Sequence, residues 1–147
     1  KMNEIEAAVG IGALDVFNDV LKKRRENLYY LMDKFSRFEP YLTTIKKEPY
    51  EDIGPHALPI IIEEDSPFTR NQLVDFMEKN GIDTRSLFQS MPTQCPGFAF
   101  LKAKASGFPN AEYIGNNGLH VGVHQDLGLK ECDYILDTIQ IFLKKNT

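Results

Sequence analysis

Several features that would mark common protein classes are missing from this sequence. Its only cysteines, Cys95 and Cys132, lie far apart and form no Cys-x-x-Cys pair, which argues against a disulfide framework and a zinc ribbon. No apolar run approaches the roughly 20 residues of a membrane-spanning helix. With a formal net charge of −4, the chain also lacks the basic excess of a nucleic-acid-binding surface. We therefore expect no nucleic acid and no membrane as partners, and reduced thiols in a cytoplasmic protein.

The remaining composition is that of a globular domain. Hydrophobic residues make up 42% of the chain and charged residues 26%, which are ordinary proportions. A chain of 147 residues can bury roughly 70% of its extended surface around one core. The sequence shows no internal repeat, low-complexity tract or second domain boundary, so we expect residues 1–147 to form a single domain.

The N-terminal quarter has the spacing of one long amphipathic helix. Apolar residues recur at steps of three and four from Asn3 to about Phe38. Gly10 and Gly12 each lower helix propensity by about 1 kcal/mol relative to alanine, so we expect a bend or a close backbone contact there. Because the pattern starts at once and without an initiator methionine, the chain is expected to be a piece of a larger protein.

Shorter elements alternate along the rest of the chain. Strands are predicted at 41–45, 56–62, 82–88 and 119–124. The continuous apolar run of the second strand favours burial on both faces, and Pro59 favours an edge or a bulge.

Helices are predicted between these strands and at the C-terminus. Thr69 and Gln72 have the spacing of a capping box, and Gly81 is the expected stop of that helix. Asn110 is predicted to cap a short helix. The last helix has a core face made of Cys132, Ile135, Leu136, Ile139, Phe142 and Leu143. Together these elements predict an α+β fold with helices packed on one face of a small mixed or antiparallel sheet.

Two candidate chemistries can be tested on the residues themselves. His120 and His124 have a spacing that places two zinc ligands on one side of a helix. The intervening Val121-Gly122-Val123 favours a strand, where four residues span roughly 13 Å, so we expect no metal site. Cys95 has no assigned base or acid, so no catalytic triad is expected.

Several short segments occur in an order and spacing that resemble one family. Together they resemble the C-terminal small domain of the DegT/DnrJ/StrS family, pyridoxal-phosphate (PLP) enzymes that aminate nucleotide-linked keto-sugars. The resemblance covers nearly the whole chain and implies the fold of the small domain of fold-type-I PLP transferases. The segments are Met2-Asn3-Glu4-Ile5, Lys23-Arg24-Arg25-Glu26-Asn27, Gly81-Ile82-Asp83-Thr84-Arg85, Asn110-Ala111-Glu112 and Asp133-Tyr134.

The resemblance also implies that the catalytic parts lie elsewhere. In this family the lysine that forms an imine with PLP, and the acid that pairs with the PLP ring, belong to a large N-terminal domain. An imine-forming lysine must be held out of water, whereas the lysines of this chain fall on polar faces, in loops or at helix ends. We therefore expect no catalytic or cofactor-binding residue in this chain, and no turnover by it alone.

Three residues are candidate substrate contacts by the same resemblance. Arg85 can grip a carboxylate or phosphate, the alternative being a salt bridge to Asp83 or another acid. His124 corresponds to a histidine that faces the substrate sugar, although a histidine at a strand end is often a packing residue. Lys1 lies where the family has a basic residue near the substrate phosphates, often of the other subunit. The basic run 22–25 is interpreted as a solvated helix face.

The leading hypothesis is the small domain of a PLP-dependent nucleotide-sugar aminotransferase of polysaccharide or deoxyaminosugar biosynthesis. Its expected partners are the large N-terminal domain, the nucleotide sugar and a second subunit in a homodimer. Residues 121–125 depart from the common Leu-Pro-Leu-His-Pro pattern and look closer to the sugar 3-dehydrase branch, in which histidine replaces the imine-forming lysine. A dehydrase and a stand-alone binding or regulatory module therefore stay open as alternatives.

Overall fold

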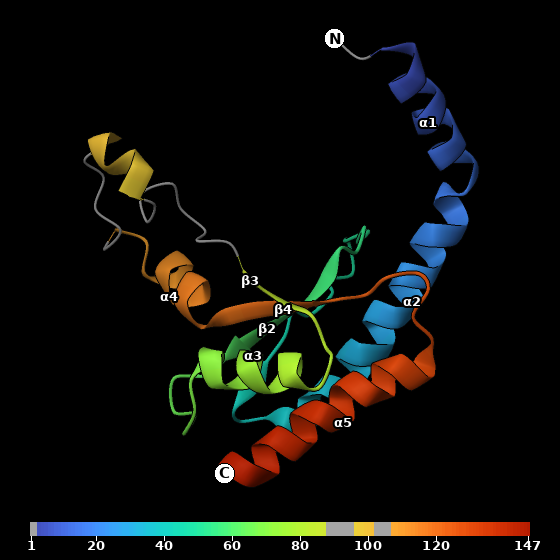
Figure 1. Cartoon of the computed structure of the whole chain (residues 1–147). Coiled ribbons are helices and arrows are strands. Elements are labelled where there is room, and N and C mark those ends of the chain that lie inside the picture. The colour runs from blue at the N-terminus through green and yellow to red at the C-terminus, as the bar shows by residue number, and fades with distance from the viewer. Residues whose placement is uncertain (1–2, 88–95, 102–106) are drawn as a thin grey trace.

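The structure is a computed structural model that describes residues 3–87, 96–101 and 107–147 (Figure 1). It has the predicted α+β organisation. Its elements, with η for a 3-10 helix, follow in the order α1 (Glu4–Asp15), α2 (Phe17–Phe35), η1 (Ser36–Phe38), β1 (Leu42–Thr43), β2 (Ala57–Ile62), α3 (Arg70–Lys79), β3 (Thr84–Ser86), η3 (Pro96–Leu101), α4 (Pro109–Asn117), β4 (Gly118–Gly122) and α5 (Leu129–Asn146). None of the described helices is long and apolar enough to cross a membrane.

The prediction of one helix up to about Phe38 is wrong. The chain leaves helical geometry at Val16, where φ is −104° and ψ is 0°, and α2 then continues in a new direction. The break does not occur at Gly10 or Gly12, and apart from the adjacent backbone of α1 and the neighbouring residues, no described atom lies within 4 Å of a Cβ placed at either glycine. Apolar residues surround α1 instead of forming one stripe, so no single face directs this helix onto the sheet.

The sheet is antiparallel throughout and has the strand order β1-β2-β4-β3. In β2, burial alternates along the strand, so the predicted burial on both faces is wrong. Leu58 lies opposite Val121 and faces the core, whereas Pro59 lies opposite His120 on the other face. Because Arg85 of β3 also pairs with His120, Arg85 shares that second face.

Pro59 is accommodated because β2 has a local edge there. Although β2 lies inside the sheet, β1 pairs only with Ile61 and Ile62. The Pro59 carbonyl points to the β1 side and accepts a hydrogen bond from Thr44 Oγ1 at 2.6 Å. The missing N–H therefore falls on a side where no strand pairs with Pro59. Because β2 as a whole lies between β1 and β4, the prediction that Pro59 would place this strand at an edge is wrong.

Helices α2, α3 and α5 cover one face of the sheet, as predicted, and α2 lies beside α5 (Figure 1). The predicted core face of α5 is buried at all six positions. The capping box of α3 is present, with the Thr69 amide donating to Gln72 Oε1 at 2.7 Å, and Gly81 follows α3 with φ of +75°. The prediction that Asn110 caps α4 is wrong, because α4 already begins at Pro109.

Candidate functional site

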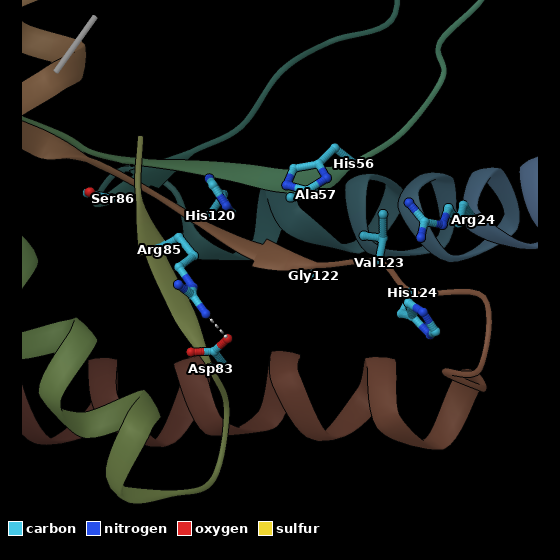
Figure 2. Close-up of a pocket in the computed structure, with 10 residues that line it drawn as sticks. All are labelled: Arg24, His56, Ala57, Asp83, Arg85, Ser86, His120, Gly122, Val123 and His124. Atoms are coloured by element: carbon cyan, nitrogen blue, oxygen red, sulfur yellow. Dashed lines mark hydrogen bonds and ion pairs between the residues drawn. The ribbon is translucent and has the colours of Figure 1, made fainter. Parts of the chain in front are cut away.

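A cleft of about 540 Å³ lies on the sheet face opposite the core helices. Strand residues line its floor, and residues from α2 and from the loops before β2 and after β4 line its walls (Figure 2). All three histidines of the sequence contribute to it. The lining residues are Arg24, His56, Ala57, Asp83, Arg85, Ser86, His120, Gly122, Val123 and His124.

Arg85 lies in this cleft. It forms a salt bridge to Asp83, which was the alternative interpretation of this residue from the sequence. Its guanidinium is 3.2 Å from the carboxylate of Asp83, and the two side chains are 71% and 77% exposed (Figure 2). An ion pair this exposed to water is weak. The pair therefore orients the Arg85 side chain and leaves most of its five N–H donors open to the cleft.

His124 lies at the cleft wall, two residues beyond the end of β4. Its Nδ1 accepts a hydrogen bond from the Asp126 amide at 3.3 Å, and its side chain is 52% exposed. The loop after it is held by α2, because the Asn27 side-chain amide donates to the His124 carbonyl at 2.8 Å and to the Leu127 carbonyl at 3.2 Å. The backbone of His124 is thus fixed, and its imidazole, whose Nδ1 also lies 3.5 Å from the Asp126 carboxylate, is half exposed at the cleft wall.

His120 is the residue that the sequence analysis missed, since it was tested there only as a metal ligand. Its ring lies on the floor of the cleft, is only 8% exposed and packs edge-on against the His56 ring, with centroids 5.6 Å apart. Burial lowers the pKa of His120, and the charges of His56 and Arg85 lower it further. A signal was present in the sequence: strand alternation places position 120 on the same face as Arg85 once β3 and β4 are paired.

The basic run at 22–25 is only partly a solvated face. Lys22 is exposed, and Lys23 pairs with Glu26 at 3.6 Å. Arg24, however, lines the cleft and donates from Nε to Gln125 Oε1 at 3.0 Å, whereas Arg25 donates to the Ile53 carbonyl at 2.7 Å. The interpretation is therefore wrong for these two arginines. Lys1 lies outside the described residues.

The lysines of the described ranges are all exposed or half-buried, and none of them lines the cleft, whereas an imine-forming lysine is held out of water. The one acid in the cleft, Asp83, is paired with Arg85. A second cleft of about 480 Å³, between β4 and α5, contains Lys130, but this side chain is exposed. Within the described ranges, no group of three or more His, Cys, Asp or Glu residues is arranged to hold a metal.

The chain is similar to enzymes that act on nucleotide sugars. It is 31% identical over 141 residues to GDP-4-keto-6-deoxy-D-mannose 3-dehydratase of Escherichia coli O55:H7, covering 93% of this chain and 35% of the relative. It is 26% identical over 148 residues to UDP-4-amino-4,6-dideoxy-N-acetyl-beta-L-altrosamine transaminase of Campylobacter jejuni, covering 99% of this chain and 38% of that one. The chain thus spans little more than a third of the length of these curated relatives.

The fold of the chain is likewise similar to one part of a longer protein of known structure. A crystal structure of GDP-4-keto-6-deoxymannose-3-dehydratase with a trapped PLP-glutamate geminal diamine superposes with a TM-score of 0.79 at 30% identity, over 92% of this chain and 35% of that protein. The model of the DegT/DnrJ/EryC1/StrS aminotransferase family matches residues 1–140. This match covers nearly the whole sequence, and the chain therefore belongs to the DegT/DnrJ/EryC1/StrS aminotransferase family.

Proposed function

We propose that this chain is the C-terminal small domain of a PLP-dependent aminotransferase that acts on a nucleotide-linked keto-sugar. The observation that carries the proposal is the family match over residues 1–140 by a chain about a third as long as its relatives. In this proposal the N-terminal part of the protein supplies the residues that hold PLP. PLP would act there as the electron sink for moving the amino group.

The small domain would bind and orient the substrate. Arg85 would hold an anionic group of the substrate by paired N–H donors, and His124 would contact the sugar from the loop that Asn27 fixes. Arg24 lines the same wall of the cleft, where Gln125 holds its guanidinium. A basic side chain at Lys1 would contribute a further phosphate contact.

The first helix would form the contact with the rest of the assembly. Along α1, Ile5, Val9, Ile11 and Leu14 are all at least 64% exposed, and no residue of this helix is buried. A helix that is apolar on all sides is normally covered by protein. We propose that the N-terminal domain and a second subunit of a homodimer pack over α1.

A second candidate reaction is 3-dehydration of the same class of substrate. The observation that favours it is the 31% identity to a GDP-4-keto-6-deoxy-D-mannose 3-dehydratase over 93% of this chain. The two reactions differ in what happens to the sugar, namely replacement of a ketone oxygen by an amine or loss of the C3 hydroxyl. A small domain of the same kind suits both reactions, because both reactions require the nucleotide sugar to be bound in the same way.

The test uses the full-length gene product with PLP, a panel of nucleotide-linked 4-keto-6-deoxy sugars and L-glutamate, with mass spectrometry of the sugar product. We expect an amino sugar. A 3-deoxy product assigns the dehydration instead, and the absence of both products with every sugar of the panel contradicts the enzyme proposal. The 147-residue chain is the matched control, and we expect it to form neither product.

A further inference from the structure

We propose that His120 and His56, together with Arg85, form an oxyanion subsite that holds a phosphate group of the nucleotide-linked substrate. This inference rests on the proposed function for its choice of substrate. It adds two residues for which the sequence indicated no ligand-binding role, and it names the part of the substrate that they contact.

The first argument is the environment of His120. The residue is only 8% exposed, and its ring nitrogens make no hydrogen bond to any residue in the described ranges. Because the one buried side-chain atom without a partner in those ranges is Asn27 Oδ1, the His120 nitrogens keep some exposure and can be reached by a ligand in the cleft, where they would be hydrogen-bonded. The ring lies on the cleft floor with His56 beside it, and His56 also has no hydrogen bond to a described residue (Figure 2). A ligand in the cleft would supply the missing partner.

The second argument is the balance of charge in the cleft. The chain has a net charge of −4, but this cleft collects three imidazoles and two guanidiniums against one carboxylate. Donors of this kind recognise oxyanions. A carboxylate offers only two oxygens, whereas a diphosphate offers several more acceptors. The number of donors therefore favours a phosphate over the carboxylate of an amino donor.

The protonation of His120 fits this assignment. Burial and the charges of His56 and Arg85 lower its pKa, with Asp83 acting weakly in the opposite direction. His124 and Arg24 are the other titratable or charged groups that line the cleft. An oxyanion bound among them would favour the imidazolium and raise the pKa of His120, so that binding is accompanied by proton uptake at pH values between the pKa of the free chain and that of the complex.

The direct test is a titration of the 147-residue chain with inorganic pyrophosphate, followed by NMR of the three histidine Hε1 signals. We expect saturable shifts at His120 and His56 and a higher pKa for His120. His56→Gln, which changes an exposed residue, should weaken pyrophosphate binding by about 10-fold or more. Lys79→Gln removes an exposed cation on α3 and should leave binding unchanged. The absence of saturable shifts, or equal losses in both variants, overturns the subsite.

Two further experiments distinguish a phosphate ligand from a carboxylate ligand and the subsite from the proposed function. In the first, glutamate replaces pyrophosphate in the titration, and tighter binding of glutamate than of pyrophosphate overturns the phosphate assignment. In the full-length enzyme, His120→Gln should raise the KM for the nucleotide sugar about 10-fold or more with a smaller change in kcat. If the His120→Gln enzyme turns over with an unchanged KM, the subsite is contradicted and the proposed function stands. If the wild-type enzyme shows no turnover but the chain still binds pyrophosphate, the proposed function alone is contradicted.

Discussion

Asn27 in α2 holds the backbone of His124 from across the fold, 97 residues away in sequence. Its amide nitrogen bridges the carbonyls of His124 and Leu127, and the side chain is fully buried. Its Oδ1 has no hydrogen-bond partner within the described ranges. The segment Lys23-Arg24-Arg25-Glu26-Asn27 thus ties α2 to the loops that surround the cleft.

We expect Asn27→Ala to destabilise the chain by about 1–3 kcal/mol, because it leaves two loop carbonyls without their donor. Urea unfolding of the chain measures this change. Asn18→Ala, at an exposed position of the same helix, should change the unfolding free energy by less than about 0.5 kcal/mol. Equal stability of the two variants would contradict the bridging role of Asn27.

Gly118→Ala is expected to destabilise the chain by about 1–3 kcal/mol through overpacking. A Cβ at this position would clash with Leu87 Cδ1 and would lie 2.5 Å from the Ile114 carbonyl oxygen. Gly122→Ala is the matched control in the same strand, because no described atom beyond the two neighbouring residues lies within 4 Å of a Cβ there. Thermal unfolding of both variants checks the difference, and a Gly118→Ala protein as stable as Gly122→Ala would be incompatible with this close approach.

The neutral form of His120 should make stability depend on pH. Its pKa in the folded chain lies below the ordinary histidine value of 6.5, so the unfolded chain takes up a proton first as the pH falls. The stabilisation of the folded chain by neutral His120 is fully present above pH 6.5 and is lost as the pH falls through the pKa of His120 in the folded chain. Urea midpoints between pH 5 and 8 should therefore fall less steeply for His120→Gln than for the wild type. Parallel pH profiles would rule out a depressed pKa at His120.

Arg85 and Asp83 can be separated by mutating each partner of their ion pair. If Arg85 contacts substrate, Arg85→Gln should raise the KM of the full-length enzyme for the nucleotide sugar about 10-fold or more. Asp83→Asn breaks the same pair and should have a much smaller effect, since both side chains are exposed. Similar KM values for the two variants would assign Arg85 a structural role only.

Local signals were sufficient for part of the elements and of the core. The capping box at Thr69, the stop at Gly81 and the buried face of α5 depend on residues within a few positions of one another, and all were predicted correctly. The break at Val16 was not, because Gly10 and Gly12 were the stronger local signal and no residue of α1 is buried against the described part of the chain.

The site depends on long-range pairing and was only partly predictable. Arg85 and His124 were identified through short segments that resemble a family, and the structure places both at one cleft. Arg24 and His120 join them only because α2 runs past the end of β4 and because β3 pairs with β4. Neither arrangement is encoded in a local pattern.

The lack of buried residues in α1 has a consequence for how the chain unfolds. A helix of 12 residues with no tertiary packing is marginal in water, even with the capping box that Asn3 provides. Its amide protons should exchange with solvent far sooner than those of α2 and α5, and fraying of α1 should leave the cooperative transition of the remaining fold untouched. Its helical order therefore depends on whatever surface covers it.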